Sequence, residues 1–255
     1  MIVKTEAIVL KRMNYRDTSR IVRLLTRDFG LISVIAKGAR DRRSRLGPLL
    51  DSLNHLQVVF YRKAGRDLHL ITQCDMVHRY STLTEDLARL GPAIAILELA
   101  GTASRAEEDG QPLFSAVADS LKSIDEGNDP SGVLLRFEMG LLSLLGFRPD
   151  FRFCVRCDSP VGPGSGTKTA NFRLTTGGII CNPCSRSETA WQEISTSSLE
   201  VLVALERSSR GDSAYQITCP QDVYRESRNI LRFFLRTHVD GMNNLKSETV
   251  FSTLE

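Results

Sequence analysis

Four cysteines are the feature that most constrains this chain. They form two C-x2-C pairs separated by 23 residues, and they are Cys154, Cys157, Cys181 and Cys184. Each pair makes a tight turn that brings two thiolates to one ion, and two such turns supply the four sulfurs of a tetrahedral zinc site. Residues 169–174 and 177–180 can pair as a hairpin between the two turns. The spacing predicts a zinc ribbon with one structural Zn2+ per chain.

Two other interpretations of these cysteines stay open, namely chance positions and a redox pair. A catalytic zinc is not expected, because it needs an open position for water and four thiolates leave none. The cellular compartment favours metal over disulfides. Residues 1–13 lack the layout of an export signal, since Lys4, Glu6 and Lys11 interrupt them. We therefore expect a reducing cytoplasm, where paired cysteines bind metal more often than they form disulfides.

Charge is distributed unevenly along the 255 residues. The first 80 residues hold 16 Lys and Arg against 7 Asp and Glu, a net charge of +9. The remainder holds 17 basic and 23 acidic residues, a net charge of −6. A basic first third joined to an acidic remainder indicates that the first third faces a polyanion. No apolar stretch approaches the roughly 18 residues of a membrane span, so we expect no membrane contact.

Hydrophobic patterning predicts strands first and helices afterwards. Short Val- and Ile-rich segments separated by turns predict strands at residues 5–12, 20–26, 31–36, 53–62 and 68–77. Five short strands in about 80 residues fit the OB-fold, a small β-barrel. From there the period becomes helical, with helices expected at residues 83–106, 113–124, 133–145, 198–207 and 221–239. Thr196 or Ser197 is expected to cap the fourth of these helices.

The predicted fold is therefore α+β and multidomain. A five-stranded OB-fold β-barrel occupies residues 1–80, and an α-helical domain occupies residues 81–255. A zinc ribbon with four cysteine ligands is inserted into the helical domain at about residues 150–188.

A basic loop follows the third predicted strand. Residues 37–45 place five cations within nine residues, and such a loop can neutralise several phosphates with release of counterions. The candidate phosphate-binding residues there are Lys37, Arg40, Arg42, Arg43 and Arg45. Other candidates on the barrel are Arg12, Arg16, Arg20, Arg23 and Arg62. The alternative is a solvated loop, and some of the barrel arginines must simply solvate the faces of strands.

Other chemistry-bearing residues add less. Phe60 and Tyr61 are adjacent on a strand and must face opposite sides, so at most one can stack on a base, and Phe60 is expected in the core. Contact between nucleic acid and the ribbon stays open, through Arg152, Arg156, Lys168 or Arg173. The four histidines are scattered without a catalytic spacing, so we expect no enzyme.

Several segments resemble a known family. Residues 15–26, Phe29-Gly30 and residues 36–40 are similar to the opening of the bacterial RecO recombination mediators. Residues 138–147, which lead into the four cysteines, and residues 230–236, followed by Leu245-Lys246-Ser247, resemble later parts of that family. The resemblance covers nearly the whole chain, and it is the combination of segments that is specific.

The resemblance implies a function in DNA repair and homologous recombination. It implies an OB-fold that binds single- and double-stranded DNA, and a helical domain that carries the zinc ribbon. Members of the family anneal complementary strands and, with the partner RecR, help to load RecA on single strands coated by single-stranded-DNA-binding protein. A nucleoid-associated place in the cytoplasm follows from DNA as partner.

The resemblance also implies a second partner. The acidic, apolar C-terminal tail of the single-stranded-DNA-binding protein would dock on the helical domain. The candidate contacts on the last long helix are Arg225, Arg228, Arg232 and Arg236. The alternative for these residues is the solvated basic edge of an amphipathic helix. For the whole chain, the competing functions are an RNA- or transcription-associated zinc-ribbon adaptor and an enzyme whose site assembles from distant residues.

Overall fold

The computed structural model of the chain describes residues 1–63, 65–104, 110–161, 169–174, 177–208 and 217–247. Two units make up the chain. The first unit contains Met1–Gly127 and the segment that begins at Asn244, and the second unit contains Asn128–Asn243. The sequence suggests a different division, at residue 80, where strands give way to helices. That division into domains stays a prediction.

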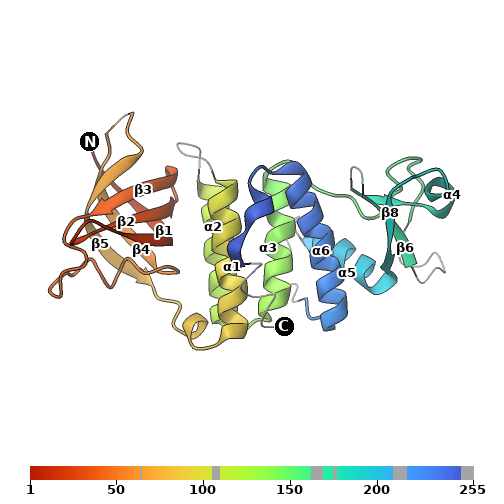
Figure 1. Cartoon of the computed structure of the whole chain (residues 1–255). Helices are drawn as coiled ribbons and strands as arrows, with labels where there is room; N and C mark the ends of the chain where they lie inside the picture. The colour runs from red at the N-terminus through yellow and green to blue at the C-terminus, as the bar shows by residue number, and fades with distance from the viewer. Residues whose placement is uncertain (64, 105–109, 162–168, 175–176, 209–216, 248–255) are drawn as a thin grey trace. The chain divides into compact units, whose positions relative to one another are not determined.

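The five predicted strands are present, and they close into a barrel (Figure 1). They are β1 (Ile2–Tyr15), β2 (Ser19–Thr26), β3 (Gly30–Ala36), β4 (His55–Tyr61) and β5 (Leu68–His78). The order around the barrel is β1-β2-β3-β5-β4, and β3 pairs with β5 in parallel while the other pairs are antiparallel. The predicted OB-fold is confirmed. Strand β1 runs beyond both predicted ends, because residues 2–4 pair with β4 and residues 13–15 continue past a bulge as a hairpin with β2.

Alternate residues of the strands fill the barrel. Val22, Val34 and Phe60 are fully buried in its core, as the two-residue period of a strand requires. Tyr61 is 48% exposed, so the two adjacent aromatic residues face opposite sides as predicted. Cys74 is buried in the same core, and burial raises the pKa of its thiol to about 11, which leaves it protonated and inert.

Two helices of the first unit pack against the barrel. A 3-10 turn, η1 (Thr82–Thr84), precedes α1 (Leu87–Ala103) and α2 (Gln111–Asp125), so the predicted helix 83–106 is a short turn followed by a separate helix. The side chain of Asp86 caps α1 by accepting a hydrogen bond from the backbone N–H of Ala88. At the start of α2, a Cβ on Gly110 would lie 2.3 Å from the carbonyl oxygen of Thr26, so only glycine permits this close approach.

A buried histidine lies where α2 covers the barrel. The ring centroids of His55 and Phe114 are 5.4 Å apart, and His55 Nε2 lies 2.9 Å from a Glu6 carboxylate oxygen. Arg27 Nη1 donates to the other carboxylate oxygen of Glu6 at 2.7 Å. Burial lowers the pKa of His55 below its usual 6.5, and this effect exceeds the opposing effect of Glu6, while the nearby charges of His78 and Arg27 lower the pKa further.

This burial predicts acid sensitivity of the first unit. Because the folded pKa of His55 is depressed, its contribution to stability is complete above about pH 6.5 and is lost as the pH falls through the folded pKa. The loss in free energy of unfolding is about 1.4 kcal/mol for each pH unit between the unfolded and the folded pKa. We expect a His55→Gln variant to lose less free energy of unfolding than the parent between neutral pH and about pH 5. Equal losses in urea titrations of both proteins would show that His55 does not titrate in this way.

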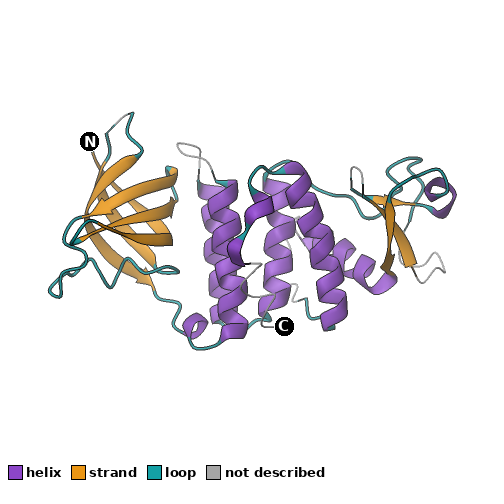
Figure 2. Cartoon of the chain, in the orientation of Figure 1, coloured by secondary structure: helices purple, strands orange, loops and turns teal. Residues whose placement is uncertain are grey.

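The second unit combines helices with a small sheet (Figure 2). Its main helices are α3 (Pro130–Leu144), α5 (Thr196–Ser208) and α6 (Gln221–His238), and a short α4 covers Asn182–Ser185. Its sheet has the order β7-β6-β8, with β6 at Thr169–Arg173, β7 at Ile179–Ile180 and β8 at Trp191–Ser195. The hairpin predicted between the cysteine pairs is confirmed as β6 and β7. Strand β8 is not among the predicted strands.

Helix α5 starts differently from the prediction. Its cap is Ser195, whose hydroxyl oxygen accepts a hydrogen bond from the backbone N–H of Ser198 at 3.1 Å. The prediction of Thr196 or Ser197 is therefore wrong, because the helix begins at Thr196 and the cap residue precedes it. None of the helices in the described ranges is long and apolar enough to cross a membrane.

Candidate metal centre and nucleic-acid interface

The structure brings the four predicted cysteines together. The sulfur atoms of Cys154, Cys157, Cys181 and Cys184 all lie within 4.8 Å of one another. Cys157 Sγ and Cys181 Sγ, which belong to different pairs, are 3.6 Å apart. Four sulfurs at about 2.3 Å from a zinc ion would be about 3.8 Å apart in a tetrahedron, so the observed cluster fits such an ion. The donor set could hold a metal ion.

Backbone hydrogen bonds shape each turn. Around the first pair, the N–H of Cys154 donates to Ser159 O at 2.8 Å, and the N–H of Asp158 donates to Cys154 O at 2.9 Å. Asp158 has a φ of 59°, a left-handed conformation that asparagine and aspartate tolerate best among residues with a side chain. Around the second pair, Ser185 N–H donates to Cys181 O at 3.0 Å. Both turns are therefore formed by the protein backbone itself.

The thiols of the cluster change one another's pKa. Hydrogen bonding with Ser159 and with neighbouring thiols lowers the pKa of Cys157 to about 6. Hydrogen bonding to Cys181 and burial raise the pKa of Cys184 to about 12, since a protonated thiol can donate to an ionised neighbour. Four thiolates at this spacing repel one another, and a divalent cation is the partner that stabilises all four.

The cluster predicts the metal content of the purified protein. Because one set of four sulfurs is present, we expect native mass spectrometry under reducing conditions to show one bound ion per chain. The mass shift should match zinc and disappear in acid, where the thiolates become protonated. A Cys219→Ser variant is the matched control, since Cys219 is half-buried outside the cluster and its loss should leave the metal in place. A metal-free native protein would contradict the metal assignment.

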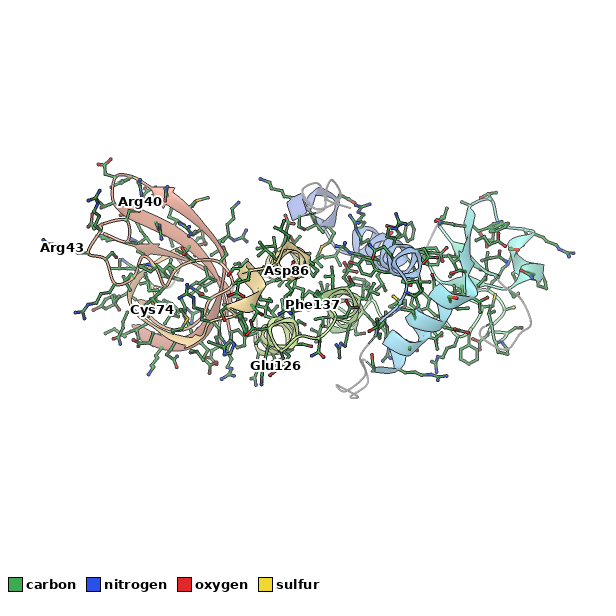
Figure 3. The ribbon with its side chains drawn as sticks, turned by 90° about the horizontal axis from the view of Figure 1, so that it is seen from below. Arg40, Arg43, Cys74, Asp86, Glu126 and Phe137 are labelled. Carbon is green, nitrogen blue, oxygen red and sulfur yellow. The ribbon has the colours of Figure 1, made fainter. Side chains whose placement is uncertain are left out.

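The cations of the predicted basic loop are of two kinds: some are exposed and can contact a ligand, and one also holds the loop in place. Lys37, Arg42, Arg43 and Arg45 are exposed to solvent. Arg40 is also exposed, but its Nη1 donates hydrogen bonds to the carbonyl oxygens of Arg16 and Asp17, at 3.0 and 2.9 Å. Arg40 therefore fastens the loop to the β1–β2 turn, and Figure 3 shows it on the barrel together with Arg43.

Two other predicted arginines also hold the loop. Arg20 Nη1 donates to the carbonyl oxygen of Gly47 at 2.7 Å. Arg12 Nε forms an ion pair with Asp51 at 2.9 Å, and Arg20 approaches the same carboxylate at 3.8 Å. Both contacts order the chain between β3 and β4. These arginines shape the surface on which the exposed cations lie.

The three remaining candidates on the barrel lie in different surroundings. Arg23 is exposed on β2, and Arg16 is exposed in the β1–β2 turn with its guanidinium 5.3 Å from the ring centroid of Tyr15. Arg62 is half-buried, with its guanidinium 5.0 Å from the ring centroid of Phe29. Of the three, Arg16 belongs to the turn to which Arg40 fastens the loop.

An apolar row on the outer face of the barrel was missed by the sequence reasoning. Strand register places five residues side by side across the sheet, in the order Met13, Ile21, Ile35, Leu70 and Tyr61. Met13 is 52% exposed, and Tyr61 is also exposed. The neighbouring row on the same face starts with Lys11 and Arg23. Only the register of the strands reveals this arrangement, since the residues come from five separate segments.

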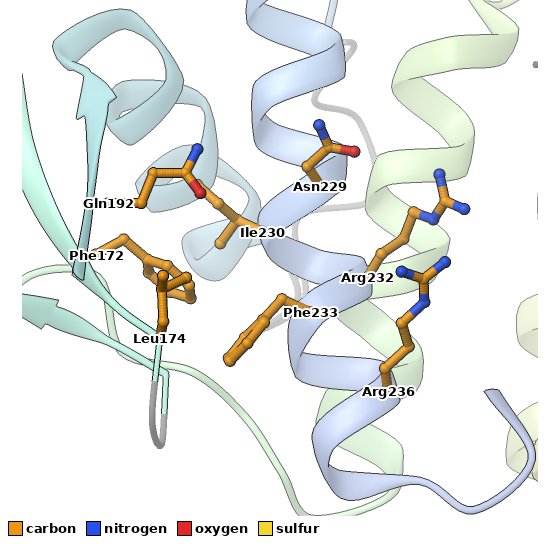
Figure 4. Close-up of a pocket in the computed structure, with 8 residues that line it drawn as sticks. All are labelled: Phe172, Leu174, Gln192, Asn229, Ile230, Arg232, Phe233 and Arg236. Carbon is orange, nitrogen blue, oxygen red and sulfur yellow. The ribbon is translucent and has the colours of Figure 1, made fainter. Parts of the chain in front are cut away.

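The four predicted arginines of α6 lie in three different surroundings. Arg228 Nε forms an ion pair with the buried Glu138 of α3 at 3.2 Å. Arg225 is exposed. Arg232 and Arg236 line a cavity of about 360 Å³ between α6 and the ribbon (Figure 4). The other residues that line the cavity are Phe172, Leu174, Gln192, Asn229, Ile230 and Phe233.

The predicted basic residues of the ribbon are largely paired with acids. Arg152 forms ion pairs with Asp150 and with the buried Glu206, at 3.1 and 3.2 Å. Arg156 and Arg173 both approach Glu188, at 3.9 and 3.7 Å. Lys168 lies outside the described residues.

Comparisons with known proteins agree with this architecture. Two family models match: the N-terminal part of recombination protein O over residues 1–80, and its C-terminal part over residues 84–248. The DNA repair protein RecO of Chlorobaculum parvum is 40% identical over 156 residues, which cover 61% of this chain and 60% of that protein. The RecO proteins of Chlorobium limicola and Syntrophus aciditrophicus are each 29% identical, over 94% and 99% of this chain and 94% and 96% of their own lengths. This chain belongs to the RecO family of DNA repair proteins.

Proposed function

We propose that this protein is a non-catalytic recombination mediator that binds single- and double-stranded DNA through its barrel. The observation that carries the proposal is the group of exposed cations, Lys37, Arg42, Arg43 and Arg45, on a loop of a closed OB-fold. OB-folds bind oligonucleotides on the face of their second and third strands and on the loops between strands 1 and 2 and between strands 4 and 5. The basic loop follows the third strand, and Arg40 fastens it to the first of these loops. We assign DNA binding to residues 1–80, and the helical remainder with its ribbon to partner contacts.

The outer face of the barrel suggests a path for a single strand. The apolar row that includes Ile21, Ile35 and Tyr61 offers contact to bases, and the adjacent Lys11 and Arg23 offer contact to phosphates. The basic loop lies at the β3 exit and extends the charged surface. Phosphate contacts carry no base information, so the protein should bind with little sequence preference.

Annealing of complementary strands follows from this surface without bond chemistry. A basic surface screens the repulsion between two phosphate backbones and raises the local concentration of strands. We further propose, from the family, that the protein acts with RecR to load RecA on single strands coated by single-stranded-DNA-binding protein. DNA as partner favours a nucleoid-associated place in the cytoplasm. We assign zinc to the four cysteines because a tetrahedral thiolate set is typical of structural zinc.

The cavity beside α6 supports the docking of a second partner, the C-terminal tail of the single-stranded-DNA-binding protein. Its floor is apolar, with Phe172, Ile230 and Phe233, while Arg232 and Arg236 add positive charge. Charge and shape therefore suit an acidic peptide that ends in an apolar side chain and a free carboxylate. We propose that the C-terminal tail of the single-stranded-DNA-binding protein docks here. A Phe233→Ala variant should bind a fluorescein-labelled peptide of aspartates ending in phenylalanine about tenfold more weakly, whereas Arg225→Ala should not.

Competition between nucleic acids tests the proposal against an RNA-associated adaptor. We expect fluorescence anisotropy to show that single-stranded DNA displaces a labelled DNA oligonucleotide at least as well as RNA of the same sequence. Phosphate contacts and stacking on bases do not require a 2′-hydroxyl group. A marked preference for RNA would favour the adaptor instead.

A further inference from the structure

The cavity beside α6 has walls from two sources. Phe172 and Gln192 come from the sheet β7-β6-β8, Leu174 directly follows β6, and the other lining residues come from α6 (Figure 4). Ring contacts join the two walls, since the ring of Phe172 lies 5.5 Å from that of Phe233 and 5.7 Å from that of Phe234, centroid to centroid. The cavity therefore exists only while the ribbon sheet lies against α6.

Few backbone contacts connect the ribbon wall to the cysteine cluster. Strand β6 pairs with β7 at two positions, one of which joins Phe172 to Ile179, and with β8 at five positions on its other side. The first cysteine turn is attached to the same short strand, because Val155 N–H donates to Ile179 O at 2.9 Å. Strand β7 ends at Ile180, and Cys181 follows directly. Phe172 is thus one strand away from both cysteine turns.

Two consecutive glycines sit between the cysteine cluster and α6. Gly177 and Gly178 both have left-handed backbones, with φ of 78° and 93°. A Cβ on Gly177 would lie 2.6 Å from the ring of Phe234 in α6, and a Cβ on Gly178 would lie 2.3 Å from Val155 Cγ1 in the first cysteine turn. The chain is therefore in close contact with α6 at one residue and with the cysteine turn at the next.

We propose that metal occupancy of the four-cysteine site controls the cavity. With the metal bound, the two cysteine turns hold β7, and β7 holds β6 with Phe172 against α6. Without it, the cysteine turns no longer hold β7, and β6 keeps only its pairing with β8, so Phe172 loses its support on the cysteine side. The inference rests on the proposed docking of an acidic peptide, and it adds that this docking requires the metal. DNA binding by the barrel, which lies in the first unit, does not.

The test compares the full-length protein loaded with zinc, stripped by a chelator in the presence of a thiol reductant, and reloaded. We expect stripping to weaken binding of the aspartate–phenylalanine peptide about tenfold or more, and reloading to restore it. Affinity for single-stranded DNA should stay unchanged. Trp191 is the single tryptophan of the chain and lies on β8, so its fluorescence reports the sheet β7-β6-β8 independently. Unchanged peptide affinity after metal loss, verified by native mass spectrometry, would overturn the inference.

Hydrogen exchange keeps the two proposals distinguishable. If the zinc-loaded protein does not bind the peptide, the docking proposal fails, and exchange then decides the metal dependence of the cavity. Stripping should accelerate amide exchange in β6 and β8 by about tenfold or more, while the barrel strands keep their rates. Equal rates in β6 before and after stripping would refute the metal dependence. A Cys157→Ser variant should reproduce the stripped state, and Cys219→Ser should behave like the loaded parent.

Discussion

Replacing Arg42, Arg43 and Arg45 together with alanine should weaken binding to single-stranded DNA by about a hundredfold at 0.1 M salt. All three side chains are exposed on the loop between β3 and β4. Each phosphate contact contributes about 0.7 to the slope of log affinity against log salt on single strands, so the slope should flatten by about 2. Arg40 is kept in this variant because its hydrogen bonds to the carbonyls of Arg16 and Asp17 hold the loop in place.

The matched control removes the same charge elsewhere. Arg186, Arg207 and Arg225 are exposed in the second unit, and their triple alanine variant changes the net charge equally. Anisotropy titrations at several salt concentrations should show a nearly parental slope for this control. An unchanged slope for the loop variant would remove the loop from the DNA interface, and equal losses in both variants would mean that net charge alone matters.

Replacing Arg228 with alanine should destabilise the second unit by about 3 kcal/mol and leave peptide binding by the folded protein nearly unchanged. Glu138 is 1% exposed, and its carboxylate lies 3.2 Å from Arg228 Nε. Removing the arginine leaves a buried carboxylate without that partner, which costs more than the loss of an exposed ion pair. Chemical denaturation followed by far-ultraviolet circular dichroism measures the change.

Arg225→Ala is the control, because Arg225 is exposed one turn earlier on the same helix. It should change the free energy of unfolding by less than about 0.5 kcal/mol. A Glu138→Gln change should rescue part of the loss caused by Arg228→Ala, since a neutral side chain no longer needs the cation. If Arg228→Ala were as stable as Arg225→Ala, the pair would be structurally unimportant and Arg228 would return to the candidates for partner contact.

Features encoded by local patterns could be predicted from the sequence. The five barrel strands follow from short runs rich in Val and Ile, and the four-sulfur cluster follows from the spacing of the cysteine pairs. The hairpin β6–β7 follows from the turns that flank it. In each case, the residue types and their spacing along the chain are enough to predict the feature.

Features that depend on distant partners could not be predicted. Nothing in the sequence separates Arg12, Arg20 and Arg40 from the exposed cations of the barrel and its loop. In the structure Arg12 pairs with Asp51, Arg20 donates to the carbonyl of Gly47, and Arg40 donates to the carbonyls of Arg16 and Asp17. Arg228 and Glu138 are 90 residues apart in the chain, and nothing local marks them as a pair. Strand β8 is short and carries Gln192 and Glu193, so it becomes a strand only through pairing with β6.

The apolar row on the barrel face illustrates the same limit. Met13 and Tyr61 lie at opposite ends of a row that crosses five strands, and each alone reads as an isolated exposed residue. Closure of the barrel fixes the register of the five strands, and this register brings the five apolar residues side by side. The candidate DNA path therefore depends on topology more than on any motif.

Annealing of complementary oligonucleotides coated by the single-stranded-DNA-binding protein of the same cell tests the central proposal most directly. Duplex formation is followed by fluorescence energy transfer between labels on the two strands. We predict that the parent protein accelerates annealing strongly, and that the Arg42, Arg43 and Arg45 triple alanine variant loses most of this acceleration. The triple control with Arg186, Arg207 and Arg225 replaced should retain it. No acceleration by the parent protein, or full acceleration by the loop variant, would contradict a mediator that acts through its basic barrel.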